Sequence, residues 1–298
     1  MSKRIRNIKI SENILMLLPT NLVLLFLIII PTILVIWFSL VGYQPTFGVP
    51  FWHAPFVALN NYARILKDAE FIISTWRTIY ISLISVSIEL VLGLMIGSIL
   101  AGQIYGKKIL FPLLIVPLMI SPIVVANNFW LIFSANGPVN QIISFITGSD
   151  FRVSWFSNPD LAMIPIVVSE IWHWYPLTFL IIFSGLISIS PSEIRAASIL
   201  GASEWQIFWH IKLPKLKTII IIAVVIRMME AMKVFDTVHL LTQGGPGTET
   251  QTISYYMFKI GFRYSQISYI SAGAWIILAI SLLGFGLALK SVLVKKVK

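Results

Sequence analysis

The chain alternates between long apolar runs and short segments rich in polar residues, glycine and proline. Six runs are long enough for a helix to cross about 30 Å of hydrocarbon, which takes about 20 residues. They cover about residues 15–40, 76–101, 109–133, 161–189, 218–241 and 270–292. We therefore predict an all-α integral membrane protein with six transmembrane helices. A tail of residues 1–14 precedes a transmembrane domain of residues 15–298.

Prolines and glycines mark special places within these runs. The third run contains three prolines, whose missing N–H groups break backbone hydrogen bonds that only a protein-lined or wet environment can replace. They are Pro112, Pro117 and Pro122. The second run contains Gly93 and Gly97, and this spacing of small residues lets another helix approach closely. A glycine tolerated at a bend is the alternative explanation.

The segment between the fourth and fifth runs, residues 190–217, is amphipathic rather than apolar. Ser190 and Glu193 have the spacing of a capping box, with a proline between them at the preferred first helical position. Gly201 is a typical residue to follow a helix end. Ser203 has a glutamine three positions later and predicts a second capping box. Because Pro214 disfavours helix continuation, we predict a helix, a glycine bend and a second helix that ends there.

The composition supports a membrane protein. The chain is 57% hydrophobic and 11% charged, whereas soluble domains contain about 25% charged residues. The net charge of +10 does not indicate nucleic-acid binding, because the basic residues lie at the ends of apolar runs. The absence of cysteine excludes a disulfide framework and a thiolate metal site. The first apolar run is too long for a signal peptide, so we expect an uncleaved first helix.

The distribution of lysine and arginine predicts the orientation. With the N-terminus inside, fourteen of the 22 basic residues lie on the inner side and six on the outer side, with Arg227 and Lys233 inside a helix. Positive residues favour cytoplasmic loops. Both termini and residues 190–217 are therefore expected in the cytoplasm.

The fifth run contains four charged residues at intervals of three, Arg227, Glu230, Lys233 and Asp236. Charges at membrane depth cost at least about 2.5–3.5 kcal/mol each and usually have a function. Arg227 could pair with Glu230, and Lys233 with Asp236, within one helix. Arg227, Glu230 and Val234 share one face. These residues either fix helix packing or line a translocation cavity, and we favour the cavity for Arg227 and Glu230.

The fourth run has a polar and aromatic face made of Glu170, His173, Trp174 and Leu177, at positions i, i+3, i+4 and i+7. Such a face suits a sugar, since hydroxyl groups need charged partners and the apolar faces of sugar rings stack on aromatic side chains. A proton relay through Glu170 and His173 is a competing use.

The amphipathic segment also resembles a known motif. Ala196 and Ala197, then Gly201 and Ala202, then Ile211–Pro214 are similar to the EAA loop in the permease subunits of binding-protein-dependent ABC importers. Three flanking segments extend the resemblance to the carbohydrate-uptake branch: Val57–Tyr62, Glu230–Asp236 and Gly244–Gly247. The chain departs from the family pattern where Arg195 and Leu200 replace acidic residues, and where Gln243 replaces a glycine.

The resemblance implies an ATP-driven importer for a sugar, oligosaccharide or polyol in the plasma (inner) membrane of a prokaryote. The implied partners are a second, similar permease subunit, two cytoplasmic ATPase subunits that hold ATP and magnesium, an extracytoplasmic solute-binding protein and membrane lipid. In such importers the helices before and after the EAA loop hold the substrate at mid-membrane, which implies that the two polar faces line the pathway. The implied contacts with the ATPase are Glu193, Arg195, Ala196, Ala197, Gly201, Ala202, Trp205, Leu213 and Pro214.

Two other classes of function were weighed against the importer. A proton-coupled secondary transporter would use Glu170, His173 and Glu230 as titrating groups and usually contains an inverted repeat, which is not evident here. An intramembrane enzyme is disfavoured by the absence of HExxH and GxSxG motifs. The chain also lacks a phosphate-binding Walker A motif, so ATP hydrolysis is expected on another chain and no cofactor or metal on this one.

Overall fold

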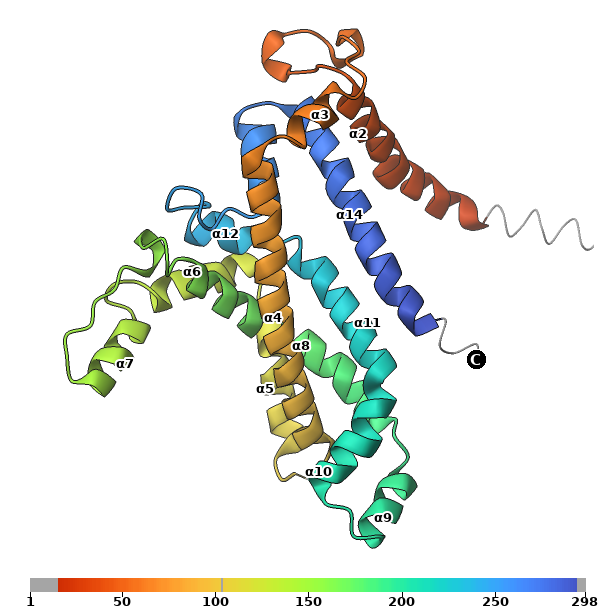
Figure 1. Cartoon of the computed structure of the whole chain (residues 1–298), viewed down its shortest axis with the longest axis vertical. Helices are drawn as coiled ribbons and strands as arrows, with labels where there is room; N and C mark the ends of the chain where they lie inside the picture. The colour runs from red at the N-terminus through yellow and green to blue at the C-terminus, as the bar shows by residue number, and fades with distance from the viewer. Residues whose placement is uncertain (1–15, 103, 294–298) are drawn as a thin grey trace, which may run out of the picture. The chain divides into compact units, whose positions relative to one another are not determined.

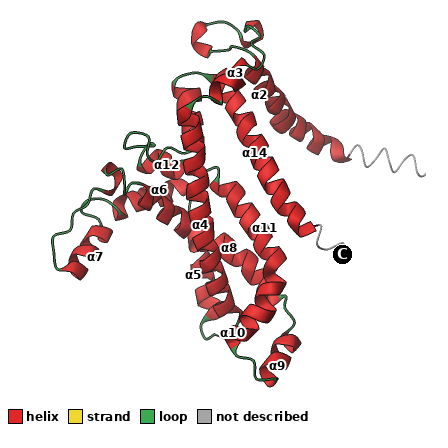
Figure 2. Cartoon of the chain, viewed as in Figure 1, coloured by secondary structure: helices red, strands yellow, loops and turns green. Residues whose placement is uncertain are grey.

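The computed structural model describes residues 16–102 and 104–293, and all regular elements in these ranges are helical (Figure 2). The expected tail at residues 1–14 and the terminal lysines Lys295, Lys296 and Lys298 lie outside the described residues. The chain divides into two compact units. The first contains residues 1–68 and 257–279, and the second contains residues 69–256 and 280–298.

Within the described residues, four helices are long and apolar enough to cross a membrane. They are Met16–Leu40, α4 (Ala69–Ala101), α8 (Met163–Ile187) and the Ile267–Leu287 part of α14 (Ile267–Leu293). A fifth span would combine α5 (Lys107–Met119) with α6 (Pro122–Ile132), which are bent by 96° at their junction. The third run was predicted as one membrane-crossing helix with backbone hydrogen bonds broken at its prolines, and the structure divides it into two helices at the third of these prolines. Pro122 starts a new helix after an extended residue, Ser121.

The predicted fifth helix is also divided. Its first part, α11 (Leu213–Ala231), contains four charged residues and is not among the apolar spans. The chain then turns before α12 (Asp236–Leu241). Hydroxyl groups at the start of α13 (Ile253–Phe258) and from the residue before it bind the carbonyls freed at this turn. Thr252 donates to Val234 at 3.0 Å and Ser254 donates to Met232 at 3.5 Å. These bonds replace the helical bonds that a continuous helix would form.

Two of the prolines that lie inside continuous helices follow a π-helical turn by two residues. The turn η1 (Leu25–Ile29) precedes Pro31 in α2 (Ile30–Leu40), and η5 (Phe208–Lys212) precedes Pro214 in α11. A proline cannot donate to the carbonyl four residues earlier, and that carbonyl lies within the π turn in both cases. The prediction that Pro214 ends a helix is therefore wrong.

The core of the second unit is the packing of α4 against α8 and α11, which lie side by side in Figure 1. Gly93 and Gly97 of α4 face α8, and a Cβ at Gly93 would lie 3.1 Å from the backbone nitrogen of Phe179. Gly185 of α8 likewise permits the close approach of α11, since a Cβ there would lie 2.5 Å from the side chain of Ile219. The prediction that Gly93 and Gly97 permit close helix approach is confirmed.

The remaining elements of the second unit are shorter. They are α7 (Pro138–Thr147), η4 (Trp155–Ser157), α9 (Pro191–Ile199) and α10 (Glu204–Ile207). Helix α12 packs against α6 and α8.

The first unit contains η2 (Pro45–Phe47), η3 (Phe51–His53), α3 (Asn60–Ile65) and η6 (Lys259–Arg263). Asn61, within the Val57–Tyr62 segment, explains part of the sequence pattern there. Its buried amide donates hydrogen bonds to the carbonyls of Ser39 and Val41, both at 3.0 Å. These bonds supply partners for backbone carbonyls at the end of α2.

Candidate functional site

The centre of the second unit contains a buried ion pair between α4 and α11. The guanidinium of Arg227 donates twice to the carboxylate of Glu89, from Nε at 2.6 Å and from Nη2 at 2.9 Å. Both side chains have an exposed fraction of 0%. This two-pronged geometry is the strongest form of arginine–carboxylate contact. It neutralises two charges that would be very costly alone at membrane depth.

The aromatic ring of Trp174 on α8 completes this cluster. The guanidinium carbon of Arg227 lies 4.7 Å from the centre of the Trp174 ring, a cation–π contact. His173 meets the same ring edge to face, with ring centres 4.9 Å apart. One arginine on α11 therefore holds the carboxylate of α4 and the indole of α8 together.

Glu170 connects α8 with α12. Its carboxylate accepts a hydrogen bond of 2.9 Å from the hydroxyl of Thr237, and only 7% of Glu170 is exposed. Of the predicted α8 face, Glu170 and His173 are buried, whereas Trp174 and Leu177 are partly exposed. The structure thus brings Trp174 and Arg227 together.

The predicted pairs within the fifth helix are wrong. Arg227 turns away from Glu230 to Glu89, and Glu230 instead binds Lys233 at 2.8 Å. The reason is the end of α11 at Ala231, which leaves Lys233 in an exposed turn beside the last helical turn. Val234 also lies beyond the helix, so it does not continue a helical face with Arg227 and Glu230. Arg227 and Val234 are buried, and Glu230 is partly exposed.

Glu89 is the functional candidate that sequence reasoning missed. It is the only acidic residue in the predicted second run, residues 76–101. A lone carboxylate at membrane depth requires a positive partner, and Arg227 is a cation within a helix of the same chain. That requirement was a signal that could have identified the pair.

The segment after α8 forms two exposed helices joined at Gly201. Gly201 has a φ of +86°, in the left-handed region that glycine adopts without strain. The amide of Ala202 donates to the carbonyl of Ala197, and the amide of Gly201 to that of Ser198, both at 3.0 Å. These two bonds form a Schellman motif, so the predicted glycine bend is confirmed. Just before it, Ile199 and Leu200 are 85% and 86% exposed.

The two predicted capping boxes differ in outcome. The box at Ser203 is confirmed, since Ser203 and Gln206 bind each other's backbone amides. The box at Ser190 is wrong, although Ser190 precedes the first helical residue as expected. The Ser190 hydroxyl instead bonds that of Ser192 at 2.7 Å, and the carboxylate of Glu193 binds Lys215 at the start of α11. The charge-assisted contact with Lys215 is stronger than the hydrogen bond to a backbone amide that a capping box would form, so the carboxylate binds Lys215 instead.

Helix α10, the turn η5 and α11 follow one another without a break. Phe208 and Leu213, where one element passes into the next, have right-handed helical φ and ψ angles. The exposed segment is therefore joined by one rod, residues 204–231, to the helix that carries Arg227.

The exposed residues at this end of the unit are chemically distinct from the buried cluster. Glu193, Arg195, Ala196, Gly201, Trp205 and Pro214 are exposed, and Ala197, Ala202 and Leu213 are partly exposed. Among the residues that the structure describes, Arg195 forms no ion pair. Within residues 16–102 and 104–293, no group of three or more His, Asp or Glu side chains could hold a metal ion.

Comparison with protein families gives a match over residues 89–294 to the family described as binding-protein-dependent transport system inner membrane component. Over 281 residues, the chain is 35% identical to the trehalose/maltose transport system permease protein MalF of Thermococcus litoralis. That alignment covers 94% of this chain and 90% of the relative.

Solved structures share the fold. A bacterial ABC transporter involved in the import of the acidic polysaccharide alginate matches with a TM-score of 0.83 and 21% identity, over 97% of this chain and 98% of that one. The bacterial alginate ABC transporter in complex with an alginate pentasaccharide-bound periplasmic protein matches with a TM-score of 0.80 and 22% identity, over 97% and 95%.

Proposed function

The chain belongs to the family of inner membrane components of binding-protein-dependent transport systems, and from this premise we propose that it forms part of the translocation pathway of an ATP-driven sugar importer. Its cargo would be a sugar, oligosaccharide or polyol. Separate ATPase subunits would hydrolyse ATP, a second permease subunit would complete the pathway, and an external solute-binding protein would deliver the cargo. None of the relatives described above is a proton-coupled secondary transporter.

The observation that carries this proposal is the uninterrupted rod of residues 204–231. One end of the rod adjoins the exposed segment that resembles the EAA loop, and the other end carries Arg227 beside Trp174. A displacement of the exposed end would therefore be transmitted to the buried cluster along one continuous helix. This is the mechanical property that a coupling segment requires.

We assign the ATPase contacts to α9, the Gly201 turn and the start of the rod. The exposed Ala196 and Gly201 leave room for a partner surface, and the apolar side chains of Ile199 and Leu200 are unusually exposed for their size. Arg195 would face a carboxylate or a helix C-terminus of the ATPase, because such groups complement a cation. Glu193 fixes the direction of α9 through its contact with Lys215.

We assign direct cargo contact to the partly exposed members of the two faces, Trp174, Leu177 and Glu230. An indole can stack on the apolar face of a sugar ring, and a carboxylate accepts hydrogen bonds from its hydroxyl groups. The buried members, Glu170, His173, Arg227 and Val234, would hold these groups in place. Arg227 does so for Trp174 through the cation–π contact.

Transport assays on two variants test this proposal. The assembled complex would be reconstituted in proteoliposomes with its binding protein, and the uptake of radiolabelled trehalose, maltose and glycerol would be compared. Trp174→Ala and Glu230→Gln are expected to lower uptake or change the cargo preference while ATP hydrolysis continues. Trp172→Ala is the matched control, since Trp172 lies on α8 but packs against Phe129 at 5.7 Å. Normal uptake and preference in both variants would refute the assignment.

A further inference from the structure

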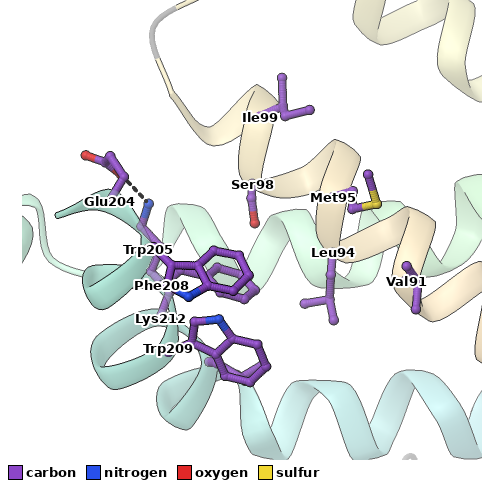
Figure 3. A pocket seen from close by; sticks show the side chains of 11 residues that line it. Val91, Leu94, Met95, Ser98, Ile99, Glu204, Trp205, Phe208, Trp209 and Lys212 are labelled. Carbon is purple, nitrogen blue, oxygen red and sulfur yellow. Dashed lines mark hydrogen bonds and ion pairs between the residues drawn. The ribbon is translucent and has the colours of Figure 1, made fainter.

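A recess lies apart from the Arg227 cluster, between the last turns of α4 and the segment formed by α10 and η5. Its volume is about 530 Å³. Figure 3 shows the rings of Trp205, Phe208 and Trp209 on one side, with Leu94 and Met95 of α4 across from them. The rest of the lining is Val91, Ser98, Ile99, Glu204, Lys212 and Leu213. We call this recess the α4–α10 pocket.

The walls of the α4–α10 pocket are suited to a hydrocarbon chain. Val91, Met95 and Ile99 follow one stripe of α4 at intervals of four residues, and each is more than half exposed in this chain. The indoles of Trp205 and Trp209 are 69% and 47% exposed. Tryptophan is enriched where a membrane meets water, because one edge of its ring is polar and the rest is apolar. The pocket therefore combines an apolar interior with the aromatic residues of a headgroup region.

A cation lies in the wall of the same pocket. The ammonium group of Lys212 is 3.5 Å from a carboxylate oxygen of Glu204, a contact drawn in Figure 3. That contact is long, and the side chain of Glu204 is 81% exposed whereas that of Lys212 is 16% exposed. A pair with one solvent-exposed partner contributes little, so an anion in the pocket can replace Glu204. Lys212 consequently keeps its capacity to bind an anion. Lys215 differs, because its ammonium group is already bound by Glu193.

We propose that the α4–α10 pocket binds an anionic phospholipid, with one acyl chain against α4 and the phosphate group at Lys212. Basic pockets between membrane helices bind anionic lipid headgroups, and each lysine near such a headgroup strengthens binding about fivefold. The lining contains one cation, Lys212, and one carboxylate, Glu204, whose side chain is 81% exposed and can turn away into solvent. A phosphate that replaces this carboxylate at Lys212, with its acyl chain in the apolar recess, fits the pocket better than a zwitterionic lipid or an apolar protein helix. The proposal does not depend on the cargo. Trp205 and Leu213 are also among the implied ATPase contacts, so the proposal requires that the pocket stay open to lipid in the assembled complex.

Fluorescence quenching by brominated lipids tests the proposal, because bromine quenches an indole that it touches. The assembled complex would be placed in phosphatidylcholine vesicles with a fixed minority of phosphatidylglycerol, and the bromines would be carried by one lipid or the other. Subtracting the emission of Trp205→Phe from that of the native chain isolates Trp205. We expect Trp205 to be quenched more strongly by a given amount of brominated phosphatidylglycerol than by the same amount of brominated phosphatidylcholine.

Two further variants assign the effect to the pocket. Lys212→Gln should weaken phosphatidylglycerol binding about fivefold and so remove the preference, whereas the exposed Lys217→Gln, outside the pocket, should retain it. Ser98→Phe fills the recess and should reduce quenching by both lipids. Its hydroxyl has no hydrogen-bond partner among the described residues, so no bond is lost. Gel filtration would confirm assembly of each variant.

Two results would overturn the proposal. Equal quenching of Trp205 by the two lipids would mean ordinary contact with bulk membrane lipid. Absence of quenching by either lipid would mean that protein covers the pocket in the assembled complex.

Discussion

The buried pair of Glu89 and Arg227 leads to the most quantitative prediction. Replacing Glu89 by leucine leaves the guanidinium of Arg227 buried at 0% exposure without the carboxylate that binds it. Removing one partner of a buried ion pair costs about 3–5 kcal/mol, because the remaining charge is uncompensated. We therefore expect Glu89→Leu to lower the free energy of unfolding by about that amount.

The partner replacement, Arg227→Met, should cost more than Glu89→Leu. It leaves the Glu89 carboxylate unpaired, again at about 3–5 kcal/mol, and it also removes the contact with Trp174. A desolvated cation–π contact contributes about 2 kcal/mol. The double variant should lose much less free energy of unfolding than the two single variants lose added together, because it leaves neither member of the pair unpaired. We expect the free energy of unfolding of the double variant to be about 2 kcal/mol below that of the native chain, because the cation–π contact is lost.

Unfolding in mixed micelles of a mild detergent and sodium dodecyl sulfate would measure these energies, with circular dichroism to follow the loss of helix. The three variants form a double-mutant cycle with the native chain. Lys233→Met is the control, since Lys233 pairs with Glu230 at an exposed site and such pairs contribute about 0–1 kcal/mol. A double variant whose loss equals the sum of the single losses would refute the reasoning, because the two side chains would then act independently.

Three other predictions concern separate parts of the second unit. Gly93→Leu should separate α4 from α8 and lower thermal stability in detergent, whereas Gly284→Leu, with no atom within 4 Å of its Cβ position, should not; equal melting temperatures would contradict the close approach. Gly201→Asp places a side chain at a φ of +86° on the proposed coupling segment. It should abolish maltose uptake by the reconstituted complex while circular dichroism stays native, and normal uptake would show that this bend is not needed. Cysteines placed at Gly106 and Gly201 should react with a membrane-impermeant maleimide only after cells are opened. Labelling in intact cells would show that the orientation is opposite to the predicted one.

Local sequence chemistry was sufficient for the short-range features. Gly201 ends α9 as its position predicts, since few other residues accept its backbone angles without strain. Ser203 and Gln206 form their capping box because the two partners lie three residues apart within one helical turn. The face of α8 that carries Glu170, His173 and Trp174 also follows directly from helical spacing.

Long-range partners could not be derived in the same way. Glu89 and Arg227 are 138 residues apart, so their contact depends on how α4 and α11 pack. The intrahelical pairs that looked sufficient were displaced by this contact, because a carboxylate from another helix reaches the buried side of α11 and Glu230 does not. The continuation of the helix through Pro214 has a similar cause. The wide turn at Phe208–Lys212 relieves a conflict that the proline rule treats as a helix end.

The same ion pair constrains how a coupling movement can travel through the unit. A push along residues 204–231 reaches Arg227, which is bound to Glu89 of α4. Separating α11 from α4 would cost about 3–5 kcal/mol at this contact alone, so the two helices should move together. The bends would then fall where the backbone is already interrupted, at Ile120–Ser121 between α5 and α6 and at Met232–Phe235 after α11. Trp174 faces Arg227 from a third helix, α8, so movement of the α4–α11 pair against α8 would displace its indole within the proposed pathway.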